Sequence, residues 1–194
     1  MITSYEFNRN IKKFNKLEKR GTFYEMFIKL IKNDYDIEAY FLILSTWNFA
    51  GFRYAINDFD IVGFKKVIKN KCNPIFNRLK KKELKTVNFN EISKDVKELY
   101  NILSSIKGIK YTGAPKLMHI KNPKLFVMWD SYIKGYYGFR KGTAEDYVNF
   151  LKKMQEMFKD IKWKNKNRTL AKVIDEYNYV NITLPALKKI KNKN

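Results

Sequence analysis

The 194-residue chain has one cysteine, one histidine, four prolines and eight glycines. A single cysteine excludes an internal disulfide framework, and one cysteine with one histidine cannot build the usual zinc sites. No apolar run approaches the roughly 18 residues of a membrane-spanning helix, and the charged, amphipathic first 20 residues are unlike a signal peptide. We therefore expect a cytoplasmic protein with no metal site and no cofactor.

The sequence also lacks the alternating pattern of strands. No alternation of Val, Ile or Thr extends beyond four residues, so a sheet of any size is not expected. Apolar residues recur instead at helical spacing, beginning with Phe7, Ile11, Phe14 and Leu17. Hydrophobic residues are 45% of the chain, enough to bury a core. The sequence predicts one compact all-α domain over residues 1–194, and it leaves room for two helical lobes with a cleft between them.

Local signals place several helix ends. Thr143 and Asp146 have the spacing of a capping box and predict a helix that begins between them. Thr112 is predicted to cap another helix, and residues 125–129 are predicted to form a short extended piece. Pro185 is predicted to open a basic tail.

Acidic residues are scarce relative to basic ones. Forty Lys and Arg face 19 Asp and Glu, for a formal net charge of +21. Such a surplus favours an anionic partner, with DNA first, RNA as an alternative and an acidic membrane surface as a minor one; we expect a monomer that does not bind membranes. Basic stripes occur at residues 65–85 and 162–172, although either stripe alone is equally well explained as solvated surface.

One aspartate ends a long segment without acids. The 31 residues from 99 to 129 contain no Asp or Glu, and Asp130 follows them. This carboxylate is either a helix N-cap or a charge placed among cations, and the two roles are compatible.

A glycine turn lies within the acid-free segment. The sequence Ile106-Lys107-Gly108-Ile109-Lys110-Tyr111-Thr112 ends one helix at an apolar-x-Gly-apolar turn and starts another at once. This pattern is typical of a helix–hairpin–helix motif, whose free backbone N–H groups hold a DNA phosphate without reading sequence. The alternative is an ordinary corner between two helices. The predicted nucleic-acid contacts here are Lys107, Gly108, Lys110, Tyr111 and Thr112.

The hairpin and the aspartate together resemble a known superfamily. Residues 108–114 are followed, after a second helix and Asn122-Pro123, by Phe126-Val127-Met128-Trp129-Asp130. This resembles the helix–hairpin–helix DNA glycosylases, which include endonuclease III, the adenine glycosylases and the oxoguanine glycosylases, over roughly residues 99–131. The resemblance implies base excision, in which the N-glycosidic bond of a damaged or mispaired base is hydrolysed. It also implies that Asp130 is the catalytic carboxylate, within a hairpin and aspartate region of about residues 91–131.

The chain departs from the superfamily at several positions. Lys110 replaces the second glycine of the hairpin, Thr112 stands where bifunctional members carry a nucleophilic lysine, and no cysteine cluster follows for an iron–sulfur module. The favoured expectation is therefore a monofunctional enzyme that uses water and forms no borohydride-trapped complex. The alternative is a relocated amine from Lys116 or Lys110, since Lys116 lies one helical turn from Thr112.

Candidate residues for handling a flipped base lie on both sides of the hairpin. Residues 41–48 resemble the superfamily's buried helix, so Trp47 or Asn48 would fill the gap left by the base, and Trp129 would stack on it. Arg140 and Lys141, in a segment with three glycines, would contact the DNA backbone or form a lid. The alternative assigns the rings to the core and this segment to a plain helix connection.

A nonenzymatic function is also compatible with the sequence. Loss of the family lysine and of the second hairpin glycine would suit a helical nucleic-acid-binding protein that keeps the scaffold and uses its charge alone. Such a protein would bind duplex DNA or RNA with a steep salt dependence and process neither.

Overall fold

The structure, a computed structural model, describes residues 3–165 and 168–192, and all regular elements in these ranges are helical. The all-α prediction is confirmed for this part of the chain. Within the same ranges, no helix has both the length and the apolar character needed to cross a bilayer. The helices are α1 (Ser4–Leu17), α2 (Thr22–Lys32), α3 (Asp36–Trp47), α4 (Phe49–Phe52), α5 (Ile61–Val67), α6 (Asn73–Leu79), α7 (Phe89–Ser104), α8 (Lys110–Lys121), α9 (Ser131–Tyr136), α10 (Ala144–Met157), α11 (Leu170–Asn178) and α12 (Leu184–Lys191), with the 3-10 turns η1 (Lys19–Gly21) and η2 (Ile56–Asp58) and the π-helical turns η3 (Ile68–Cys72) and η4 (Tyr179–Thr183).

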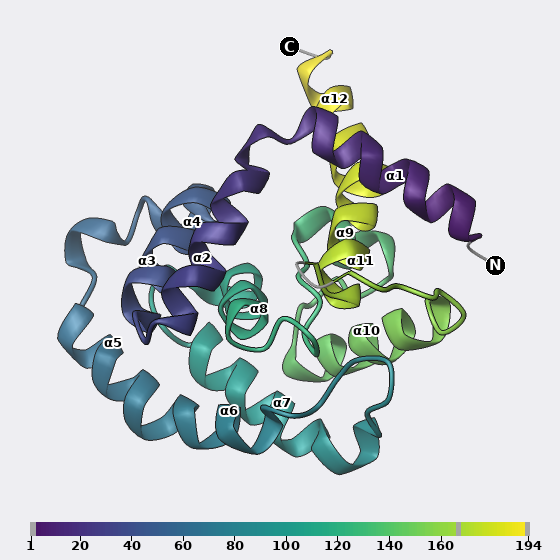
Figure 1. Ribbon diagram of the computed structural model, residues 1–194. Helices are drawn as coiled ribbons and strands as arrows, with labels where there is room; N and C mark the ends of the chain where they lie inside the picture. The colour runs from purple at the N-terminus through teal and green to yellow at the C-terminus, as the bar shows by residue number, and fades with distance from the viewer. Residues whose placement is uncertain (1–2, 166–167, 193–194) are drawn as a thin grey trace.

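Helix α8 lies near the centre of the molecule, between two groups of helices (Figure 1). Helices α2, α3 and α7 pack directly on α8, and α10 packs on α7. The N-terminal helix α1 packs mainly with α11 and η4 near the C-terminus. The two ends of the chain therefore build the same side of the molecule (Figure 1).

One continuous buried cluster joins the two groups. It includes Phe27 and Ile43 from the side of α2 and α3, and Phe150 and Ile174 from the side of α10 and α11. Trp129 belongs to the same cluster and is 1% exposed. The described helices thus share one hydrophobic core.

The capping box at α10 forms as predicted. Thr143 Oγ1 accepts a hydrogen bond of 3.1 Å from the backbone N–H of Asp146, and Asp146 Oδ2 accepts one of 3.2 Å from the N–H of Thr143. Residues 126–130 form neither helix nor strand and lead directly into α9, whereas Leu125, the first residue of the predicted extended piece, lies in a turn.

One local prediction was wrong. Thr112 does not cap α8, because α8 already begins at Lys110 and the Thr112 hydroxyl instead donates to Asn48 Oδ1 at 3.0 Å. Pro185 does begin a basic terminal segment, and this segment is helical, with Pro185 in the first turn of α12. Proline is tolerated there, since the first-turn N–H groups of a helix have no intrahelical partner.

Candidate active site

A cavity of about 110 Å³ lies where α1, α3, α8, α9, α11 and η4 meet. It brings together four residues singled out in the sequence, which come from three separate segments: Trp47, Lys116, Trp129 and Asp130. The other lining residues are Phe14, Glu18, Met128, Ile133, Lys172, Asp175 and Tyr179.

Asp130 both caps a helix and faces the cavity. Its Oδ1 accepts hydrogen bonds from the backbone N–H groups of Tyr132 at 2.8 Å and Ile133 at 2.9 Å, which fixes the start of α9. Its Oδ2 accepts a hydrogen bond of 2.7 Å from the Thr183 hydroxyl of η4. The N-cap role considered from the sequence is thus observed, and the same carboxylate lines the cavity together with Lys116 and Lys172.

Lys116 is buried, and its amine reaches back over the first turns of α8. Its Nζ donates to the Thr112 carbonyl at 2.8 Å and to Asn48 Oδ1 at 3.4 Å. Burial lowers the pKa of the Lys116 amine to about 8, although the nearby charges of Asp130 and Asp175 act in the opposite direction. About a tenth of the amine is thus neutral at pH 7, and a nucleophilic lysine must be at least partly neutral.

Asn48 connects Lys116 with the glycine turn. Its amide nitrogen donates to the Gly108 carbonyl at 3.3 Å, and its Oδ1 accepts from Thr112 and Lys116. The side chain is 7% exposed and is therefore already engaged inside the protein. In this conformation, Asn48 holds the turn against the cavity rather than presenting itself to solvent as a wedge.

The glycine turn depends on two left-handed residues. Gly108 has a φ of +86° and Lys110 a φ of +52°. A Cβ on Gly108 would lie 2.6 Å from the Ala55 Cβ, so this position excludes side chains for both conformational and steric reasons. Lys110, the replacement for the second glycine, takes up a conformation that glycine favours.

Most of the predicted nucleic-acid contacts share one surface region, whereas Gly108 is buried. Lys107, Lys110 and Tyr111 are exposed on the turn, and Lys107 pairs with Asp58 at 3.1 Å. Lys134 connects this turn to the segment with three glycines, because its Nζ lies 4.9 Å from the centroid of the Tyr111 ring and donates to the Arg140 carbonyl. The exposed residues Arg140 and Lys141 therefore lie beside the turn. Lys110 does not line the cavity, whereas Lys116 does.

The two tryptophans contribute differently to the cavity. Trp129 is almost fully enclosed, and its Nε1 donates to the Tyr111 carbonyl at 2.8 Å. Trp47 is partly exposed, and its ring contacts Phe27 edge-on at 5.3 Å and stacks on Tyr24 at 6.2 Å. Of the two rings, Trp47 is the more accessible.

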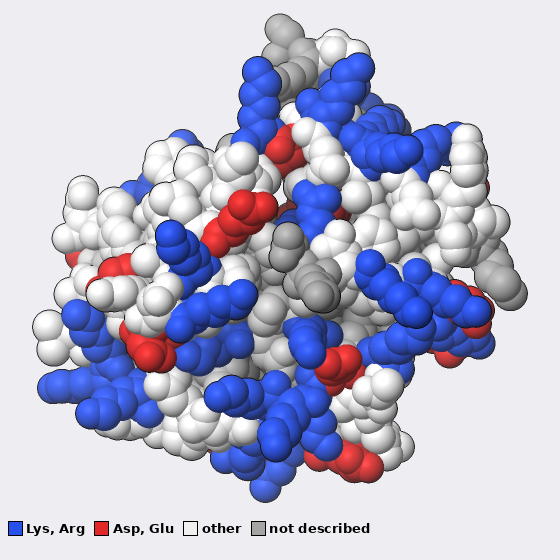
Figure 2. Space-filling model, in the orientation of Figure 1, with Lys and Arg blue, Asp and Glu red and all other residues white. Residues whose placement is uncertain are grey.

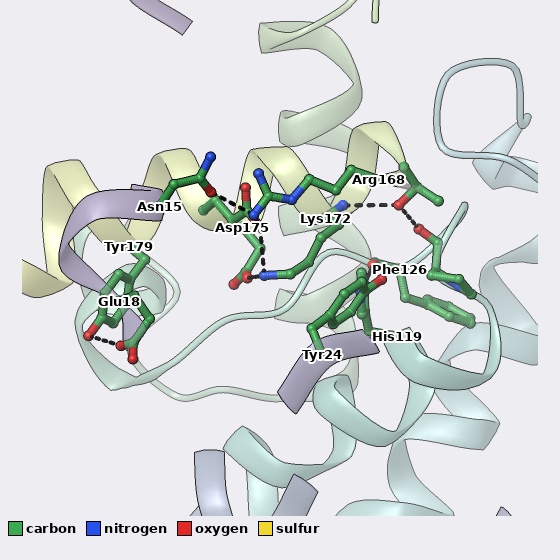
Figure 3. Close-up of polar contacts among 12 residues, drawn as sticks. Asn15, Glu18, Tyr24, His119, Phe126, Arg168, Lys172, Asp175 and Tyr179 are labelled. Atoms are coloured by element: carbon green, nitrogen blue, oxygen red, sulfur yellow. Dashed lines mark hydrogen bonds and ion pairs between the residues drawn. The ribbon is translucent and has the colours of Figure 1, made fainter. Parts of the chain in front are cut away.

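Lys172 is a second buried lysine in the cavity wall, and sequence analysis did not single it out. Its Nζ lies 3.1 Å from Asp175 Oδ2 and 3.3 Å from Glu176 Oε1 (Figure 3). The ammonium group also lies 4.9 to 5.0 Å from the ring centroids of Phe14, Tyr24 and Trp47. Carboxylates three and four residues ahead of a lysine on one helix were a local signal for this cluster.

The only histidine, His119, supports this wall. Its Nδ1 bonds the Phe126 carbonyl, so Nδ1 carries the proton and Nε2 accepts the Tyr24 hydroxyl at 3.0 Å (Figure 3). Burial lowers the pKa of His119 to about 3, which keeps the ring neutral. His119 thereby fixes the Tyr24 ring that lies under Lys172.

Glu18 and Tyr179 connect the end of α1 to η4 at the cavity. The Tyr179 hydroxyl donates to Glu18 Oε2 at 2.8 Å (Figure 3). Both residues were missed in the sequence because they lie 161 positions apart and share no motif. Among the described residues, no cluster of three or more His, Cys, Asp or Glu is arranged to hold a metal ion.

Comparisons with known proteins identified no matching family, no matching curated protein and no matching solved structure. The assignment of function therefore depends on the geometry of the cavity and on the resemblance of residues 99–131.

Proposed function

We propose that the protein is a base-excision DNA glycosylase that cleaves the N-glycosidic bond of a damaged or mispaired base. The observation that carries this proposal is the shared cavity of Lys116 and Asp130. Lys116 supplies an amine with a pKa of about 8, and Asp130 supplies a carboxylate fixed by three hydrogen bonds. A partly neutral nucleophile beside a fixed negative charge suits the breaking of a bond that builds positive charge on a sugar.

The cavity favours Lys116 over water as the nucleophile. The neutral Nζ forms a bond to C1′ of the sugar as the N-glycosidic bond breaks, and the electron pair of that bond leaves with the base. The carboxylate of Asp130 stabilises the positive charge on the sugar and takes up the proton that the attacking amine releases. Asp130 then returns this proton to the ring oxygen as the C1′–O bond breaks, and the lone pair of the bound nitrogen forms a protonated imine between Lys116 and C1′. Lys110 is outside the cavity and has no part in this step.

Aromatic rings support the handling of a flipped base. A glycosylase takes its target base out of the duplex stack and encloses it in a pocket. Phe14, Trp47, Trp129 and Tyr179 line the cavity and offer faces for such a base. Trp47 is the favoured stacking residue, because its ring is the more accessible of the two tryptophans.

The surface charge supports DNA as the substrate. Lys and Arg side chains outnumber Asp and Glu side chains on the face seen in Figure 2, in keeping with the net charge of +21. The turn at Lys107, Gly108 and Lys110 and the neighbouring Arg140 and Lys141 are assigned to phosphate contacts. Such contacts position the duplex without reading its sequence.

The test is release of a base from duplex oligonucleotides that each carry one lesion or mismatch. Asp130→Asn should lower the rate about 100-fold or more while leaving DNA binding little changed. The fold should survive, because asparagine is as good an N-cap as aspartate. Asp60→Asn is the matched control, since Asp60 caps α5 in the same way and does not line the cavity. Undiminished release by Asp130→Asn would contradict the proposed role.

A nonenzymatic nucleic-acid-binding protein is the second candidate. It is favoured by one observation, that both oxygens of Asp130 already accept hydrogen bonds within the protein. This candidate predicts binding to duplex DNA or RNA that weakens steeply with salt, with no base released from any lesion duplex. Release that depends on Asp130 would exclude it.

A further inference from the structure

Lys172 and Asp175 place a hydrogen-bond donor and an acceptor side by side in the cavity wall. Both residues line the cavity, and Figure 3 shows their charged ends in contact. A lysine carries three N–H donors, and Lys172 uses one of them on Asp175, while Glu176 is an ion-pair neighbour at 3.3 Å. Asp175 Oδ1 accepts no hydrogen bond from the described part of the chain, whereas Oδ2 accepts from Lys172. The attack of Lys116 at C1′ requires neither group.

This pair is held in a fixed orientation. Lys172 is 1% exposed, and three aromatic rings and two carboxylates surround its ammonium group. The Tyr24 ring, one of these three rings, is itself fixed by the neutral His119. Polar groups fixed at defined positions in an otherwise aromatic wall are the usual means by which a pocket selects its ligand.

The size of the cavity limits the base that it accepts. An apolar cavity of about 150 Å³ holds one benzene-sized ring, and the cavity beside Asp130 measures about 110 Å³. The cavity is smaller than that, so a single-ring base already requires some widening of the wall, and a two-ring purine requires considerably more.

Building on the proposed glycosylase function, we propose that Lys172 and Asp175 are specificity-determining residues, and that the base they recognise is a pyrimidine with a carbonyl beside a ring N–H, as in uracil and its derivatives. The carboxylate of Asp175 accepts from the ring N–H, and the ammonium of Lys172 donates to the adjacent carbonyl. In a cytosine-type base the ring nitrogen is an acceptor and the neighbouring exocyclic group is a donor. Such a base can pair with both Asp175 and Lys172 only if its ring is flipped over.

The test uses four duplexes that differ at one nucleotide. Uracil has one ring and the favoured edge, a ring N–H beside a carbonyl. Hypoxanthine has the same edge on a two-ring base, and 5-hydroxycytosine has one ring with donor and acceptor exchanged. The fourth duplex carries an abasic site, which has no base. We expect the protein to release uracil at least about tenfold faster than either other base, because the wrong edge leaves a buried polar group unpaired. Equal release of hypoxanthine would overturn the size selection, and equal release of 5-hydroxycytosine would overturn the edge assignment.

Asp175→Asn tests the pair directly. The carboxamide adds an N–H donor, so release of uracil should fall about 10- to 100-fold while 5-hydroxycytosine gains relative to uracil. Borohydride cross-linking to the abasic site should not fall, because no base is read there and because loss of the Asp175 charge, which raises the pKa of Lys116, increases the neutral fraction of that amine. Asp60→Asn is the control, since Asp60 neither lines the cavity nor contacts Lys172, and it should keep the ratio of uracil release to 5-hydroxycytosine release.

The outcomes separate this inference from the function on which it depends. If Asp175→Asn keeps the ratio of uracil release to 5-hydroxycytosine release, and cross-linking at the abasic site is intact, the specificity role of Lys172 and Asp175 is overturned. The glycosylase function is then unaffected. No release of any base and no reaction at the abasic site by the unchanged protein would overturn the glycosylase function, and the inference with it.

Discussion

Burial of Lys116 affects stability as well as reactivity. The folded chain holds the pKa of this amine near 8, against 10.5 for the free group. Below pH 8 both the folded and the unfolded chain bind the proton, so the full penalty of burying a charge applies. Between about pH 8 and 10.5 the unfolded chain binds more protons, and stability therefore rises with pH across this window.

Replacing Lys116 should therefore stabilise the fold. Lys116→Met, which replaces the amine with an unbranched apolar side chain one atom shorter, should raise the free energy of unfolding at pH 7 by up to about 3 kcal/mol, and this gain should shrink as the pH approaches 10.5. Urea denaturation of both proteins at pH 7 and pH 10 measures the effect. Lys110→Met is the control, because that amine is exposed. A gain that does not change with pH would show that the buried charge is not its cause.

Lys110 carries backbone strain in the turn. At a φ of +52°, a residue with a Cβ is disfavoured relative to glycine by about 1 kcal/mol. Lys110→Gly should therefore stabilise the protein by about this amount in thermal or urea denaturation. Lys110→Ala should bring no such gain, since it removes the charge and keeps the Cβ. Equal effects of the two substitutions would point to charge rather than conformation.

At the scale of elements, the turn between α7 and α8 is fixed by the packing of Gly108. Gly108→Ala places a methyl group 2.6 Å from the Ala55 Cβ at a φ of +86°. It should destabilise the fold by about 3 kcal/mol or more, as overpacking and strain act together. Denaturation midpoints measure this loss.

Gly138 is the matched control for Gly108. It has a φ of +89°, but a Cβ there meets no atom within 4 Å. Gly138→Ala should therefore lower the free energy of unfolding by about 1 kcal/mol only, from backbone conformation alone. If both alanines destabilise the protein equally, the contact with Ala55 is not what excludes a side chain from the turn.

Helix ends were predictable from the sequence where the cap is local. The box of Thr143 and Asp146 needs only residues three positions apart, so the sequence was sufficient. The cap assigned to Thr112 failed because its hydroxyl bonds Asn48, 64 positions away. A hydroxyl that has a distant partner cannot be told from a capping hydroxyl by spacing alone.

At the scale of the whole molecule, the cavity combines segments that no motif connects. Trp47, Lys116, Trp129 and Asp130 were identified from short patterns, and the fold brings them into one cavity. Phe14, Glu18, Lys172, Asp175 and Tyr179 reach the same cavity because α1 packs on α11 and η4. That packing joins the two ends of the chain, and local periodicity contains no information about it.

The whole site has a defined pH response. If the neutral amine of Lys116 attacks the sugar, the rate should follow the fraction of Lys116 that is unprotonated. With a pKa of about 8, this fraction rises about tenfold between pH 7 and pH 9. The covalent imine that forms is reduced by borohydride to a stable link between protein and DNA.

Borohydride cross-linking to lesion-containing duplexes is the most direct test that the cavity of Lys116 and Asp130 is the active site. The account predicts a cross-link with the unchanged protein that increases about tenfold from pH 7 to pH 9, persists in Lys110→Ala and is lost in Lys116→Ala. No cross-link with the unchanged protein, or an undiminished cross-link in Lys116→Ala, would contradict it.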